Sequence, residues 1–91
     1  MAIVTLRYWA AAKDAAGVAE DKVDALTLAD ALAGGIAAAA ERPGDHAEPL
    51  RQVMARSSYL VDGQPAGTRP TESILLSADS VIEVLPPFAG G

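Results

Sequence analysis

The chain has 91 residues, 51% of them apolar, with a formal charge of −5 and no cysteine. This length predicts one domain with a thin core rather than a deep enzyme cleft, and the lack of cysteine excludes disulfides, thiolate catalysis and cysteine-bound metals. The acidic balance argues against a nucleic-acid partner and fits docking onto a basic protein surface.

The first predicted element is a strand over residues 2–9, AIVTLRYW, because β-branched and aromatic residues favour a pleated, half-buried surface. Its side chains alternate between two faces. One face carries Val4, Leu6 and Tyr8. The other face carries Ile3, Thr5, Arg7 and Trp9. Because this second set includes Thr and Arg, we expect it to face solvent, which places Trp9 on the outside. The alternative is a strand phase shifted by one residue, which would place Trp9 in the core.

A short helix is expected over residues 10–16, AAAKDAA, with Gly17 at its C-terminal cap. Residues 18–25 are weakly strand-like and are expected to form a short return strand at a sheet edge. The acidic residues of this strand predict a solvated edge, with contact to a basic protein surface as the alternative. These residues are Glu20, Asp21 and Asp24.

The one long amphipathic segment predicts a helix over residues 28–41. Thr27 precedes it as the N-cap, and Pro43-Gly44 ends it. Apolar residues recur in it at spacings of four, which predicts a buried stripe along one face. The stripe consists of Leu28, Leu32 and Ile36, and Ala39 and Ala40 continue it.

Neither the glycine pair inside this helix nor the single histidine indicates a reactive site. Gly34-Gly35 follows no strand in a nucleotide-binding pattern, so we interpret it as close packing between helix and sheet. His46 is expected to be a solvated loop residue. The sequence also shows no carboxylate dyad, no Ser-His-Asp set and no metal-ligand spacing.

The segment from residue 45 to residue 65 predicts a second helix followed by a hairpin. A shorter helix is expected over residues 45–56, with Leu50, Val53 and Met54 on one face. A strand over residues 58–62 then enters a tight turn at Asp62-Gly63, a strong hairpin signal.

The last predicted strand covers residues 81–85, VIEVL, with Ile82 and Val84 facing inward and the charged residue between them facing outward. The order of elements predicts an α+β fold, with one sheet and the long helix packed across one face. Nothing else in the sequence is available to cover the opposite face, which carries Trp9 and Leu85. An uncovered apolar patch of this kind predicts an interface.

The chain closes with the run Leu-Pro-Pro-Phe-Ala-Gly-Gly, which combines several distinctive properties. The diproline is a stiff extended spacer that directs the chain away from the sheet. Phe88 is an apolar anchor with no core left to join, and Gly90 and Gly91 fit a channel too narrow for a residue with a Cβ. A carboxylate at the tip can be activated as an acyl adenylate. We therefore divide the chain into one domain over residues 1–85 and a flexible tail over residues 86–91.

This tail, together with the segments RYWAAAKDAAG and SYLVDGQ, resembles the MoaD/ThiS family of ubiquitin-like sulfur carriers. Within that family the chain is most similar to the small subunit of molybdopterin synthase. The resemblance extends over essentially the whole chain. It implies a β-grasp fold with a mixed sheet, and it implies a non-catalytic subunit that has no activity alone.

The resemblance further implies a chemical role for Gly91. In this family an E1-like enzyme uses ATP to adenylate the terminal glycine, and a sulfur donor converts it to a thiocarboxylate. The tail then enters the large subunit of molybdopterin synthase, where the sulfur passes to a pterin precursor in molybdenum cofactor biosynthesis. Gly91 and its neighbour Gly90 are thus the expected reactive residues, with no cofactor or metal bound by this chain. The residues expected to contact the partners are Trp9, Leu85, Pro86, Pro87, Phe88 and Ala89.

Three alternatives share these features. The chain could be a sulfur carrier for thiamin, cysteine or tungsten-cofactor biosynthesis. It could be a protein modifier conjugated through Gly91 to lysines, as ubiquitin is. It could also be a plain interaction module whose tail is incidental. In every case we expect a cytoplasmic protein, because no apolar run reaches the ~18–20 residues of a membrane span and the first residues lack the pattern of a signal peptide.

Overall fold

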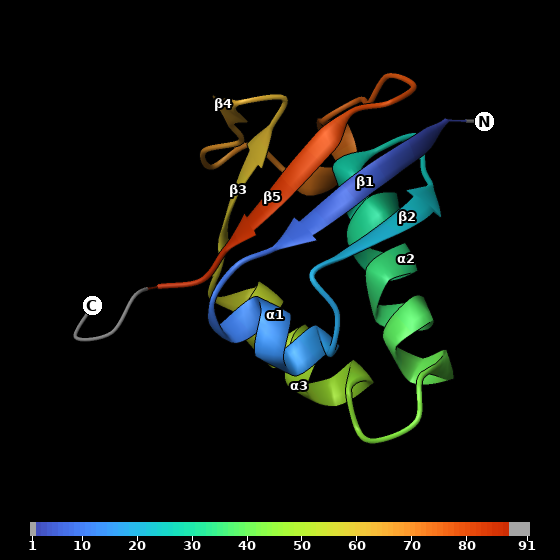
Figure 1. Cartoon of the computed structure of the whole chain (residues 1–91). Coiled ribbons are helices and arrows are strands. Elements are labelled where there is room, and N and C mark those ends of the chain that lie inside the picture. Colours follow the sequence, from blue (N-terminus) through green and yellow to red (C-terminus); the bar gives the residue numbers. More distant parts are fainter. Residues whose placement is uncertain (1, 88–91) are drawn as a thin grey trace.

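The computed structural model describes residues 2–87. Within this range five strands form one mixed sheet in the order β2-β1-β5-β3-β4. The strands are β1 (Ile3–Tyr8), β2 (Glu20–Asp24), β3 (Ser58–Val61), β4 (Gln64–Pro65) and β5 (Val81–Leu85). The helices are α1 (Ala11–Ala16), α2 (Leu28–Glu41) and α3 (Ala47–Ala55), with a 3₁₀ turn at Thr71–Ser73. Strands β1 and β5 are parallel and the other paired strands are antiparallel, which confirms the predicted mixed sheet (Figure 1).

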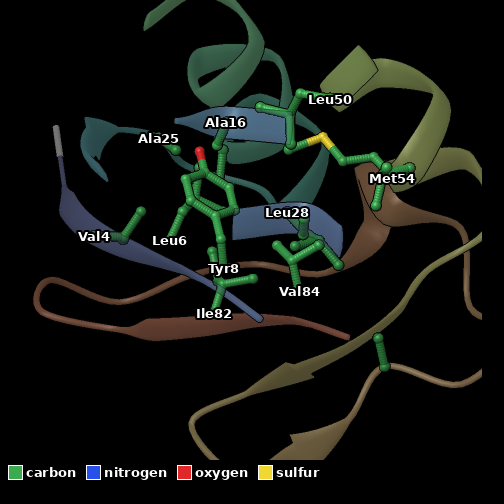
Figure 2. Packing of buried hydrophobic residues seen from close by; sticks show 14 of the residues in the cluster. Val4, Leu6, Tyr8, Ala16, Ala25, Leu28, Leu50, Met54, Ile82 and Val84 are labelled. Atoms are coloured by element: carbon green, nitrogen blue, oxygen red, sulfur yellow. The ribbon is translucent and has the colours of Figure 1, made fainter. Parts of the chain in front are cut away.

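The hydrophobic core lies between the helices and the inner face of the sheet. Alternate side chains of β1 and β5 point into it, among the buried side chains of the helices (Figure 2). The strand residues are Val4, Leu6, Tyr8, Ile82 and Val84, and the helix residues that meet them include Leu28, Leu50 and Met54. The inner faces predicted for the first and last strands are therefore confirmed.

The long helix α2 has the bounds that the sequence predicts. Thr27 caps it, because its Oγ1 accepts a hydrogen bond from the backbone N–H of Asp30 at 3.1 Å. The predicted buried stripe needs correction, since Leu32 and Ile36 are only half-buried and Ala40 is exposed. The fully covered row is Leu28, Ala31, Gly35 and Ala39.

Gly35 explains why this row of mostly small residues faces the sheet. A Cβ added to Gly35 would lie 2.6 Å from the Tyr8 hydroxyl oxygen and 2.7 Å from Leu6 Cδ1. A Cβ on Gly34 would lie 3.1 Å from Val23 Cβ. The missing side chains let α2 approach β1 and β2 closely, which confirms the interpretation of the glycine pair as a packing feature.

The Asp62-Gly63 turn between β3 and β4 is also confirmed. Asp62 has a φ of 51° and Gly63 a φ of 82°, as a two-residue hairpin with both central residues left-handed requires. The Asp62 carboxylate accepts hydrogen bonds from Ser80 Oγ and from the Val81 N–H, each at 2.9 Å. The turn is therefore fastened to the start of β5.

The longest helix in the described range, α2, has 14 residues. None of the helices between residues 2 and 87 combines the length and the apolarity that crossing a membrane requires.

Candidate functional site: the end of the sheet beside the tail

The parallel pairing of β1 and β5 places the ends of both strands at the same edge of the sheet. Tyr8 lies opposite Val84, and the Trp9 N–H donates a hydrogen bond to the carbonyl oxygen of Val84 at 3.3 Å. Figure 1 shows the chain leaving β5 next to the end of β1. Trp9 therefore stands beside the segment that leads from Leu85 into the tail.

The two prolines of the diproline differ in burial. Pro86 is buried, whereas Pro87 is exposed. The boundary expected between residues 85 and 86 stays a prediction, and so does the partner contact expected for Pro86.

The tail residues with the predicted chemical roles are Phe88, Ala89, Gly90 and Gly91. They lie outside the described residues. Their roles stay predictions, as do the predicted partner contacts of Trp9, Leu85 and Pro87.

Trp9 points outward, as predicted, with 44% of its surface exposed. Its indole Nε1 donates a hydrogen bond to Glu83 Oε1 at 3.2 Å. Glu83 lies opposite Arg7 on β1 and opposite Leu60 on β3, so it sits in the middle of the outer face. The sequence indicated that Glu83 faces outward, but no spacing along the chain indicated that it would bind an indole 74 residues away.

The outer face around Trp9 also carries apolar side chains. Leu60 and Leu85 are half-buried. Leu60 lies on β3 opposite Glu83, and Leu85 lies at the end of β5 opposite Ser58. The helices that the structure describes contribute to the core on the other side of the sheet. Trp9, Leu60 and Leu85, which we call the outer patch, therefore remain available to a partner.

A surface hollow of about 350 Å³ adjoins Trp9. Arg7, Lys13 and Glu20 line it, and Arg7 Nε lies 3.8 Å from Glu20 Oε2. Both side chains of this pair are about half exposed, so the ion pair contributes little stability. An open hollow with mixed charge fits a protein contact better than a pocket for a small ligand.

Asp21 does not belong to the solvated acidic edge predicted for β2. Its carboxylate accepts hydrogen bonds from Arg42 Nη1 at 2.9 Å and Nη2 at 3.1 Å, and another from the Tyr8 hydroxyl at 2.9 Å. The side chain of Asp21 is only 13% exposed, and that of Arg42 is only 20% exposed. Burial, and then the hydrogen bond to Asp21, raise the pKa of the Tyr8 hydroxyl far above its ordinary value. Asp21 therefore belongs to an internal hydrogen-bond network with Tyr8 and Arg42.

This network and His46 hold the end of α1. Arg42 Nε donates a hydrogen bond to the carbonyl oxygen of Ala16 at 2.8 Å, and His46 Nδ1 lies 2.9 Å from the carbonyl oxygen of Ala15. His46 is therefore a half-buried contact residue, and its predicted place in a solvated loop is wrong. Gly17 ends the helix with a φ of 80°, as its predicted capping role requires.

No protein-family model and no curated protein matches this chain. Solved structures do match it across nearly its full length. The small archaeal modifier protein 1 (SAMP1) of Methanosarcina acetivorans is 21% identical with a TM-score of 0.78, and the match covers 100% of this chain and 98% of that one. A Pyrococcus furiosus chain assigned as subunit 1 of a molybdopterin converting factor is 18% identical with a TM-score of 0.72, and the match covers 97% and 100%.

A third match is a chain in the complex of subunits 1 and 2 of the molybdopterin-converting factor from Helicobacter pylori. It is 19% identical with a TM-score of 0.63, and the match covers 98% of this chain and 99% of that one. At these identities the likeness concerns the fold. The chain has the β-grasp fold of these ubiquitin-like proteins, and its resemblance to the MoaD/ThiS type is confirmed at that level.

Proposed function

We propose that this protein is a sulfur carrier whose reactive group is the carboxylate of Gly91, and that it serves as the small subunit of molybdopterin synthase. The observation that carries the proposal is the direct continuation of strand β5 into Pro-Pro-Phe-Ala-Gly-Gly, on a β-grasp domain like those of the converting-factor subunits. The outer patch beside this exit supports a partner that receives the tail.

The chemistry requires only the chain's terminal acyl group. An activating E1-like enzyme joins the Gly91 carboxylate to the AMP portion of ATP and releases pyrophosphate. A sulfur donor then displaces AMP, which leaves a thiocarboxylate. The sulfur of a thiocarboxylate is a better nucleophile than a carboxylate oxygen. Insertion of the tail into a partner orients this nucleophile and excludes water, and residues without a Cβ allow the narrow passage.

The partner that fits this role is the large subunit of molybdopterin synthase. Support comes from the Helicobacter pylori structure, in which subunits 1 and 2 of the converting factor form a complex. Trp9 and Leu85 lie at the tail end of the sheet and supply apolar contact area there. The chain then acts as a non-catalytic subunit without turnover of its own, and it binds no cofactor; ATP is consumed by the activating enzyme.

The proposal is tested by reconstituting sulfur transfer with the activating enzyme, a sulfur donor and the large subunit from the same host. Deletion of Gly91, or extension of the chain by one residue beyond it, abolishes transfer to the pterin precursor. We expect both variants to keep the melting temperature of the wild type, because the proposed mechanism needs Gly91 only for chemistry and not for packing. Transfer that persists in either variant rejects the mechanism.

The resemblance to the archaeal modifier proteins favours a second candidate function, which is conjugation of Gly91 to lysines of other proteins. Isopeptide-linked products carrying the Gly-Gly remnant on lysine side chains support it. Their absence, together with a thiocarboxylate on the free chain, supports the sulfur carrier. Acceptors from thiamin, cysteine and tungsten-cofactor biosynthesis, tested in the same reconstitution, separate the remaining pathways.

A further inference from the structure

We propose that Glu83 is a positioning residue that holds the Trp9 indole in its binding orientation before any partner arrives. This inference rests on the proposed function for the identity of the partner, the large subunit. Its structural part concerns this chain alone. No motif in the sequence marks Glu83, and the role follows from how three elements meet at Trp9.

The backbone of Trp9 is fixed on both sides. Its N–H donates to the Val84 carbonyl oxygen at 3.3 Å, and its own carbonyl oxygen accepts from the Ala12 N–H at 2.9 Å. Between these bonds, Ala10 adopts a φ of 49° and a ψ of −123°, a conformation that residues with a side chain rarely adopt. This corner turns the chain from β1 into α1 over only two residues, Trp9 and Ala10.

The helix that follows this corner is itself anchored. The carbonyl oxygens at its end meet Arg42 and His46, at 2.8 Å and 2.9 Å, and the residues Ala12 and Ala16 are fully buried. Trp9 thus stands between a parallel strand pair and a clamped helix. Its Cα has little freedom, so the remaining motion is rotation of the side chain.

Glu83 restricts that rotation. The indole Nε1 donates to Glu83 Oε1 at 3.2 Å while 44% of the Trp9 surface stays exposed. Glu83 is a member of a central strand, paired on both sides with Arg7 and Leu60, so the acceptor is carried on a rigid backbone. The result is a half-exposed aromatic side chain that is held in one orientation by a hydrogen bond to a charged group.

Such an arrangement has a direct consequence for binding. Tryptophan is among the residues that most often dominate the energy of an interface. Immobilising a side chain at an interface costs free energy, and a side chain that is already ordered avoids part of this cost. Glu83 therefore raises affinity through Trp9, whether or not its carboxylate touches the partner.

The test uses the full-length chain, in which Trp9 is the single tryptophan and therefore the only source of indole fluorescence. Glu83→Ala removes the acceptor, and Glu83→Gln keeps an acceptor while removing the charge. Time-resolved fluorescence anisotropy measures indole motion in the isolated chain. Calorimetric titration with the host's large subunit measures affinity.

For Glu83→Ala we expect at least a doubling of the fast depolarisation amplitude and about a threefold to tenfold weaker affinity for the large subunit. Glu83→Gln keeps a weaker, uncharged acceptor, so we expect it to show smaller changes than Glu83→Ala in both measurements. Unchanged indole motion in Glu83→Ala overturns the proposal, and so does unchanged affinity despite greater motion. Equal effects in the two variants also overturn it, because they assign the effect to charge rather than to the hydrogen bond.

The two proposals fail separately. If the wild-type chain does not bind the large subunit, the proposed function fails, while the anisotropy of the isolated variants still decides whether Glu83 holds the indole. A melting temperature measured for each variant separates loss of orientation from loss of folding.

Discussion

At the scale of single residues, Ala10 holds an uncommon backbone conformation. Its φ of 49° and ψ of −123° are easier for glycine than for alanine. We expect Ala10→Gly to raise the free energy of unfolding by ~1 kcal/mol, because relief of about 1–3 kcal/mol of strain exceeds the entropic cost of a new glycine, about 0.4–1 kcal/mol. Urea denaturation measures the change.

The matched control is Ala37→Gly, at an exposed position inside helix α2. There the backbone is helical, so glycine lowers stability by ~1 kcal/mol. Two substitutions of the same chemistry thus change stability in opposite directions. A loss of stability in Ala10→Gly comparable with that of the control contradicts the assignment of strain to Ala10.

Tyr59 links stability to alkaline pH. Its hydroxyl donates a hydrogen bond to the Met54 carbonyl oxygen at 2.6 Å, and burial raises its pKa from 10.0 to about 12. The folded chain therefore keeps a proton that the unfolded chain releases. This contribution to stability is present below pH 10 and is lost as the pH rises towards 12.

We therefore expect the free energy of unfolding to fall between pH 10 and pH 12, and to fall less steeply in Tyr59→Phe. Part of the slope remains in this variant, since the pKa of Tyr8 is raised as well. Unfolding monitored at several pH values checks this. Equal slopes in the variant and the wild type contradict a raised pKa at Tyr59.

At the scale of elements, the contact between α2 and β1 depends on one missing side chain. A Cβ on Gly35 would lie 2.6 Å from the Tyr8 hydroxyl, which is held by Asp21, and 2.7 Å from Leu6, which is fully buried. We expect Gly35→Ala to destabilise the fold by ~1–3 kcal/mol, because the helix must move away from the sheet. Thermal and chemical unfolding both report the change.

Gly34→Ala is the neighbouring control. Its new Cβ would meet Val23 at 3.1 Å, which is a smaller conflict, and alanine gains about 1 kcal/mol of helix propensity over glycine. The two effects oppose each other, so we expect a change within ~1 kcal/mol. If Gly35→Ala is as well tolerated as Gly34→Ala, the helix does not require this close approach.

Regular elements were predictable from the sequence because their signals are local. The alternation in residues 3–8 and 81–85 gave the correct faces of β1 and β5, and Thr27 with Pro43-Gly44 gave the bounds of α2. The face of α2 was predicted incompletely, since a pattern of large apolar residues overlooks the small ones that permit close packing.

Contacts between distant segments were not predictable. Asp21 and Arg42 are 21 positions apart, and Trp9 and Glu83 are 74 apart, so the topology of the sheet decides both pairs. Asp21 looked like a surface carboxylate because it lies between two other charged residues, Glu20 and Lys22. The burial of Pro86 beside an exposed Pro87 was likewise not predicted from the diproline.

At the scale of the whole molecule, the proposed function assigns one task to the packed domain and another to the C-terminal residues. The domain supplies stability and the outer patch, and the tail is proposed to supply the reactive acyl group. Phe88 is the predicted anchor of that tail. We expect Phe88→Ala to weaken binding to the large subunit by ~1–3 kcal/mol and to leave the melting temperature unchanged. Calorimetric titration and thermal unfolding check the two parts.

The affinity and the melting temperature of Phe88→Ala together test whether Phe88 serves the partner or the domain. A lower melting temperature in Phe88→Ala would mean that this side chain serves the domain. Unchanged affinity would remove Phe88 as an anchor for the partner. Glu83→Ala is also expected to weaken binding without loss of stability. It differs from Phe88→Ala because it increases the motion of the Trp9 indole.

The most direct measurement for the sulfur-carrier account is the mass of the C-terminal peptide after the chain reacts with ATP, its activating enzyme and a sulfur donor. The account predicts the mass increase that accompanies replacement of one oxygen by sulfur, located at Gly91 and reversed when the large subunit and pterin precursor are added. A C-terminal peptide that keeps its carboxylate mass throughout, while sulfur still reaches the pterin, would contradict it.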